Sequence, residues 1–115
     1  MLTISLNAKV ILLTEANFDE TLKSSSYLVA GVFQRGCHSC LLAKTLIYEL
    51  DLEYGELVTF GLIDYEKNKE LAKQLKTRAF PSLYFYKEGK LNSFHAGPIL
   101  QGRFENLLTH LLTTD

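Results

Sequence analysis

The chain of 115 residues contains no tryptophan, only two prolines and only two cysteines. Two cysteines are too few for a small scaffold held together by disulfides, so the fold must depend on a hydrophobic core. The hydrophobic content of 47% suffices for one core, and the length indicates a single domain over residues 1–115. No apolar run approaches the roughly 18–20 residues that span a bilayer, so we expect no membrane segment.

The chain also lacks an excess of charge of either sign. Its 12 basic and 13 acidic residues give a net charge of -1. They are spread along the chain, so there is no basic stripe for a phosphate backbone, and nucleic acid is not an expected partner. The first residues, M-L-T-I-S-L-N-A-K, show none of the features of a secretory leader. We therefore expect a cytoplasmic protein, in a compartment where thiols stay reduced. A monomer is also expected.

Hydrophobic patterning predicts alternating strands and helices followed by a hairpin. Tyr27–Phe33 is an unbroken apolar run, which is typical of a central strand buried on both faces. The fold class is therefore α/β, with a mixed central sheet of four to five strands flanked by about four helices. The other expected strands are Lys9–Leu13, Leu57–Ile63, Ser82–Tyr86 and Leu91–His95, and the other expected helices run from Asn17 to about Lys23, from His38 to about Glu53, from Asp64 to Thr77 and around Phe104–Leu112.

Two details of these elements can be predicted. A spacing of four residues predicts that the helix beginning at His38 turns its leucines inward. The turn between the last two strands contains Gly89, where a positive φ angle is expected. The expected inward residues of the helix are Leu42, Leu46, Ile47 and Leu50.

Cys37 and Cys40 lie at the junction between the central strand and this helix. One helical turn brings residues i and i+3 close enough to form a disulfide. The helix N-terminus favours negative charge, so the pKa of the Cys37 thiol should fall below the free value of about 8.5. Cys37 is then the attacking residue, and Cys40 is the resolving one.

From about Lys9 to Leu112 the chain resembles the thioredoxin family. The resemblance is carried by Cys37-His38-Ser39-Cys40 after a buried strand and by Phe80-Pro81-Ser82 at the start of the hairpin. It implies the thioredoxin fold and a cis peptide bond before Pro81. It also implies a thiol-disulfide oxidoreductase that reduces or exchanges protein disulfides in cell redox homeostasis. No bound cofactor is expected, and the electrons would come from a separate reductase.

The same resemblance implies a groove beside the dithiol in which an extended segment of the partner protein binds. Residues that match groove positions are expected to contact this substrate segment. They are Phe33, Gly36, Phe80, Pro81 and Gly97.

The chain departs from the family at several positions near the dithiol. Gly31 and Gly36 stand where the family carries an acidic residue and a tryptophan, and Phe60 stands where it carries a lysine. Loss of both charges avoids an unpaired buried charge and leaves an apolar floor under Cys40. Since an apolar setting disfavours the thiolate, resolution by Cys40 should be slow.

Several alternatives remain open at this stage. His38 is either a partner that stabilises the Cys37 thiolate or a solvent-facing residue at the helix start. A zinc site needs about four ligands, and the only further candidates are His38, His95 and His110, so no metal site is expected. The main alternative function is a thioredoxin-fold protein-binding module with a weak or vestigial dithiol. A metal-handling or redox-sensing protein is a third possibility.

Overall fold

The computed structural model describes residues 9–114. Residues 1–8, on which the expectation of no secretory leader rests, lie outside the described part, as does Asp115. Within residues 9–114, no helix has the length and apolar character needed to cross a membrane. The elements in chain order are β1 (Ile11–Leu12), α1 (Phe18–Ser24), β2 (Tyr27–Phe33), α2 (His38–Tyr54), β3 (Thr59–Asp64), the 3-10 helix η1 (Tyr65–Lys67), α3 (Lys69–Gln74), β4 (Ser82–Lys87), β5 (Lys90–Ala96) and α4 (Gln101–Thr113).

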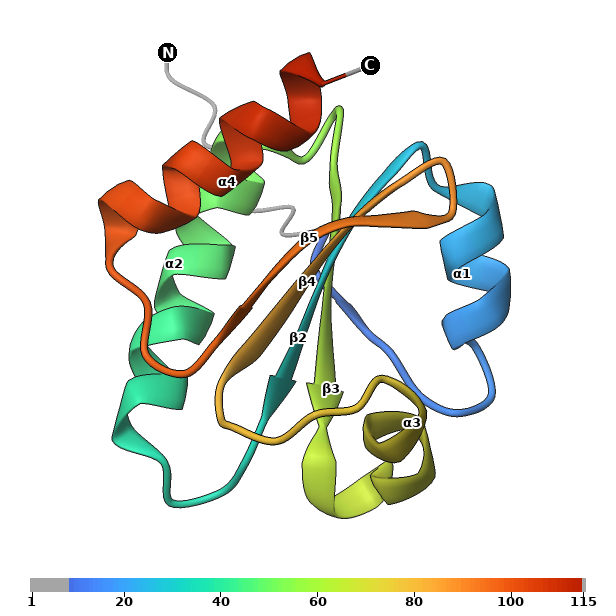
Figure 1. The fold of residues 1–115 in the computed structure, drawn as a ribbon, viewed down its shortest axis with the longest axis vertical. Coiled ribbons are helices and arrows are strands. Elements are labelled where there is room, and N and C mark those ends of the chain that lie inside the picture. Colours follow the sequence, from blue (N-terminus) through green and yellow to red (C-terminus); the bar gives the residue numbers. More distant parts are fainter. Residues whose placement is uncertain (1–8, 115) are drawn as a thin grey trace, which may run out of the picture.

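The five strands form one mixed sheet in the order β1-β3-β2-β4-β5. β1, β3 and β2 run parallel, β4 runs antiparallel to β2, and β5 runs antiparallel to β4. Helices α2 and α4 cover one face of the sheet, and α1 and α3 lie on the other (Figure 1). The predicted fold class, a mixed sheet flanked by four helices, is confirmed.

β2 is the central strand, and it is buried on both faces. Leu28, Ala30 and Val32 lie in the core layer next to α1 and α3. Val29 and Phe33 lie in the layer next to α2 and α4. Because successive side chains of a strand point to opposite faces, an unbroken apolar run satisfies both layers at once. The predicted bounds of this strand agree with those observed.

The inward face of α2 differs from the prediction. Leu42 is 55% exposed, whereas Ile47 and Leu50 are buried as expected. An α-helix turns about 100° per residue, so Leu42, five residues before Ile47, lies about 140° around the helix from it. The spacing of four residues therefore predicted the wrong orientation for Leu42, which lies on the exposed side of the first turns. The buried residues of α2 are Cys40, Ala43, Ile47, Leu50 and Asp51.

The single helix predicted over Asp64–Thr77 is also wrong, because the segment divides at Asn68 into η1 and α3. Asn68 has φ -140° and ψ 51°, which no helix accommodates. Its buried side chain donates to the Asp64 carbonyl at 3.0 Å and accepts from the Glu15 backbone N–H at 3.1 Å. The second bond joins segments far apart in the sequence, so local periodicity could not reveal it.

The hairpin between β4 and β5 turns at Glu88 and Gly89, which both have positive φ, 52° and 80°. Positive φ was expected for the glycine only. A residue with a Cβ is disfavoured in this left-handed region, and asparagine tolerates it better than glutamate does.

Glu88→Asn should therefore raise the free energy of unfolding by about 0.5–1 kcal/mol, because Asn-Gly is the preferred pair for such a turn. Urea unfolding measures the change. Glu88→Ala is the matched control, since it removes the exposed carboxylate but keeps a Cβ without a local hydrogen-bonding group. Equal stabilisation by alanine and asparagine would show that the charge, and not the backbone conformation, is responsible.

Candidate dithiol site

Cys37 and Cys40 come together where β2 ends and α2 begins, and the structure pairs them as a disulfide with Cα atoms 5.2 Å apart. Gly36 has φ 68°, a left-handed conformation that lets the chain turn from the strand into the helix. Cys37 is the N-cap residue, with φ -106° and ψ 109°. Its Sγ accepts a hydrogen bond from the Cys40 N–H at 3.2 Å. The nucleophile expected from the sequence therefore occupies an anion-favouring position.

The two sulfurs differ in access to solvent. Cys37 is partly buried, whereas Cys40 is only 1% exposed and belongs to the core layer of α2 and α4. Cys37 is therefore the more accessible of the two sulfurs. The roles expected from the sequence, attacking for Cys37 and resolving for Cys40, stay predictions.

The side chain that touches the reactive sulfur is Ser39, with Oγ 3.4 Å from Cys37 Sγ. His38, which the sequence analysis considered as a thiolate partner, is exposed. No hydrogen bond of the His38 ring is found among residues 9–114. The contact of Ser39 was not predicted, because only charged groups were considered as thiolate partners, although a hydroxyl within the first helical turn is a visible signal in the sequence.

Buried aromatic side chains pack in the core layer that contains Cys40. Phe33 is 2% exposed and Phe60 is fully buried, and both pack in the same cluster as Cys40. A Cβ atom placed on Gly31 would lie 2.5 Å from Cζ and 2.6 Å from Cε2 of Phe33. The Phe33 ring thus occupies the space that a side chain at position 31 would need. Phe33 is thus a core residue in this structure, and its expected contact with a substrate segment stays a prediction.

Phe80 and Pro81 lie in the loop before β4, and Gly97 directly follows β5. The Phe80–Pro81 peptide bond is cis, and the Phe80 carbonyl oxygen lies 3.9 Å from Cys37 Sγ. The Gly97 N–H donates to the Pro81 carbonyl at 2.7 Å, and Gly97 has φ 91°. Pro81 and Gly97 are buried, so Phe80 is the member of this group that presents side-chain surface beside the sulfur. Its ring packs on Tyr65 at a centroid distance of 4.8 Å.

A shallow hollow of about 350 Å³ opens beside the disulfide. Leu41 lines it and is 61% exposed, which agrees with the apolar surroundings expected from the sequence. Gly36, which was expected to contact the substrate, also lines this hollow and is exposed. The remaining lining residues are Gln34, Arg35, Cys37, His38, Cys40 and Lys44.

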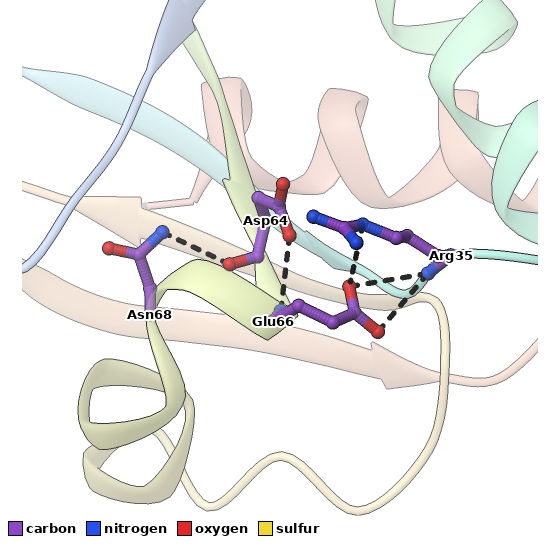
Figure 2. A network of polar contacts seen from close by, with 4 residues as sticks. All are labelled: Arg35, Asp64, Glu66 and Asn68. Atoms are coloured by element: carbon purple, nitrogen blue, oxygen red, sulfur yellow. Dashed lines mark hydrogen bonds and ion pairs between the residues drawn. The ribbon is translucent and has the colours of Figure 1, made fainter.

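A polar network anchors the loop that precedes Cys37 (Figure 2). The Arg35 backbone N–H faces both carboxylate oxygens of Glu66 at 3.4 Å, and Arg35 Nε lies 4.0 Å from Glu66 Oε1. Asp64 in turn accepts a hydrogen bond from the Glu66 N–H at 3.1 Å. The loop after β2 is thus tied to the turn after β3, a connection that the sequence analysis did not foresee.

The other histidines lie in different settings. The His95 ring is 2.9 Å from the Pro98 carbonyl oxygen, and His110 lies on α4 beside Thr114. In the described range 9–114, no group of three or more histidine, cysteine or acidic side chains is arranged to hold a metal ion.

The chain is similar in sequence to known thioredoxins and to a protein disulfide-isomerase. A sequence model of the family described as Thioredoxin matches residues 9–110. Protein disulfide-isomerase 1 of Caenorhabditis elegans is 29% identical over 91 residues, which is 76% of this chain but only 19% of that protein. The thioredoxin of Buchnera aphidicola subsp. Acyrthosiphon pisum is 26% identical over 92 residues, covering 79% of this chain and 85% of that protein.

A solved structure has the same fold. Malassezia sympodialis thioredoxin (Mala s 13) matches this structure with a TM-score of 0.85 at 16% sequence identity. The match covers 95% of this chain and 96% of that one. The expectation of a thioredoxin fold is thereby confirmed.

The packing of Phe33 against Gly31 can be tested by a double-mutant cycle. Gly31→Ala should lower the free energy of unfolding by about 1–3 kcal/mol, because the new methyl group overlaps the ring. In a Phe33→Leu background the same substitution should cost clearly less, since the ring is gone. Urea unfolding of the four proteins gives the coupling energy.

The control is Gly102→Ala in α4, where an added Cβ would meet no atom within 4 Å. This change should be neutral or stabilise by up to about 1 kcal/mol. An equal cost of Gly31→Ala in both backgrounds would contradict the proposed overlap.

Proposed function

The chain belongs to the thioredoxin family, and we propose that it reduces or exchanges protein disulfides through Cys37 and Cys40. The observation that carries the proposal is the unequal placement of the two sulfurs. Cys37 is accessible at a helix N-cap, whereas Cys40 is buried. The Cα atoms of the two cysteines lie 5.2 Å apart. Cys37 can be reached by a large substrate, and the protected thiol of Cys40 lies beside it. This arrangement suits two successive thiol-disulfide exchange steps.

In the first step, the Cys37 thiolate attacks one sulfur of the substrate disulfide. The substrate S–S bond breaks, the second substrate sulfur leaves as a thiolate, and a mixed disulfide to Cys37 forms. Cys40 then loses its proton and attacks Cys37 Sγ, which releases the first substrate sulfur as a thiolate. The substrate gains two electrons and the Cys37–Cys40 pair loses two, so a reductase must return them.

The second step is the one that the floor of the site should slow. Cys40 is 1% exposed and packs among apolar residues such as Phe33 and Phe60. Burial in apolar surroundings disfavours the thiolate that the second step requires. The floor offers no carboxylate at position 31, because that position is Gly31 and the Phe33 ring fills its space. The thiol proton of Cys40 must therefore be transferred toward the hollow beside the disulfide.

The partner is proposed to be an extended protein segment that crosses Phe80 and Pro81. The Phe80 carbonyl oxygen lies 3.9 Å from Cys37 Sγ, so a segment bound at this loop would hold its sulfur close to the nucleophile. The exposed Leu41 side chain at the hollow offers apolar contact to the same segment. The proposal places the protein in the cytoplasm as a monomer that contributes to cell redox homeostasis, without a bound cofactor.

Substitution of each cysteine tests the proposal. Cys37→Ser should abolish reduction of a model protein disulfide such as that of insulin, because no nucleophile remains. Cys40→Ser should lose turnover but accumulate a mixed disulfide, which non-reducing electrophoresis and mass spectrometry detect. Wild-type protein that fails to reduce the substrate with a chemical reductant supplied would contradict the proposal.

The same experiment addresses the alternative of a binding module. The exposed Leu41 is compatible with docking that does not need the dithiol. If the double Cys→Ser variant holds a defined substrate protein as tightly as the wild type does, and the wild type does not reduce it, binding alone is the function.

A further inference from the structure

The reactive sulfur is in contact with a neutral hydroxyl. Ser39 is partly buried, and its Oγ lies 3.4 Å from Cys37 Sγ. In the disulfide neither sulfur carries a proton, so the hydroxyl is the only donor in this contact. Ser39 therefore directs its proton toward Cys37.

The second donor to the sulfur is the Cys40 backbone N–H at 3.2 Å. Ser39 and Cys40 both belong to the first turn of α2, which Cys37 caps. Breaking the disulfide does not require either donor to move, because they share one helical turn with the sulfur. Hydrogen bonds to an ionised acceptor are roughly twice as strong as those between neutral groups. Both contacts should therefore strengthen when Cys37 becomes a thiolate.

We infer that Ser39, and not His38, is the side chain that stabilises the Cys37 thiolate and thereby shifts the redox equilibrium of the dithiol. This inference rests on the proposed dithiol chemistry. Reduction adds two electrons to the disulfide, breaks the S–S bond, leaves Cys37 as a thiolate and places one proton on Cys40. A hydrogen bond that is stronger to the thiolate stabilises the reduced state, which makes the couple more oxidising.

The other groups that face the sulfur do not provide this contact. Arg35, His38 and Lys44 line the hollow beside Cys37, yet no hydrogen bond within residues 9–114 joins their side chains to the sulfur. From the loop before β4, the group that faces Cys37 is the Phe80 carbonyl, which is uncharged and can only accept. Ser39 is thus the side-chain donor within reach.

The test is Ser39→Ala in a Cys40→Ser background, in which Cys37 is the only thiol. The apparent pKa of Cys37 is read from thiolate absorbance and from the rate of alkylation as a function of pH. Loss of one hydrogen bond to a charged group should raise this pKa by about one unit, which lowers the thiolate fraction about tenfold below the pKa. Ser39→Thr keeps the hydroxyl and should restore most of the shift.

In the intact dithiol, Ser39→Ala should shift the equilibrium with glutathione about tenfold toward the disulfide, equivalent to about 30 mV. Thr45→Ala is the matched control. It removes an exposed hydroxyl from the same helix, one that bonds the Leu41 carbonyl, and both measurements should stay at the wild-type values. Circular dichroism of each variant checks that the fold is retained.

An unchanged Cys37 pKa and glutathione equilibrium in Ser39→Ala would overturn the inference. So would a larger shift in His38→Ala than in Ser39→Ala, since the imidazole would then be the stabilising group. A wild-type protein that does not reduce protein disulfides, while Ser39→Ala still raises the Cys37 pKa, would remove the proposed function and leave this contact established.

Discussion

The burial of β2 between two helical layers is the constraint on which the rest of the structure depends. Its side chains alternate between the cluster around α1 and α3 and the cluster around α2 and α4. A strand held on both faces and paired with β3 and β4 has a fixed register. Its last residue is Phe33, and only Gln34, Arg35 and Gly36 separate it from Cys37. The position of the reactive sulfur is therefore set by core packing several residues away.

The same packing decides the chemical character of the site. The resemblance to thioredoxins implies an acidic residue and a lysine at the positions of Gly31 and Phe60, and here the Phe33 ring fills the space above Gly31. Replacement of a buried ion pair by well-packed apolar groups is often neutral or stabilising. This apolar packing also has a consequence for the proposed chemistry. With glycine at position 31, the site has no carboxylate there that could accept the Cys40 proton.

The polar groups that contact the Cys37 sulfur are neutral and local. The sulfur of Cys37 is met by the Cys40 N–H, the Ser39 hydroxyl and the Phe80 carbonyl. Two of these come from the start of α2 and one comes from the loop before β4, so two separate segments of the chain surround the sulfur. The ion pair of Arg35 with Glu66 acts indirectly, because it anchors the loop that precedes Cys37.

Four features could be predicted from the residues alone: the order of elements, the bounds of β2, the positive φ of Gly89 and the placement of the two cysteines at a helix start. These follow from hydrophobic periodicity and local geometry, which act over a few residues. Four other features required the folded chain: Asn68 breaks the third helical segment, Leu42 faces solvent, Phe33 belongs to the core and Ser39 contacts the sulfur. Each of these depends on side-chain direction or on a contact between segments far apart in the chain, and neither is encoded in the spacing of residue types.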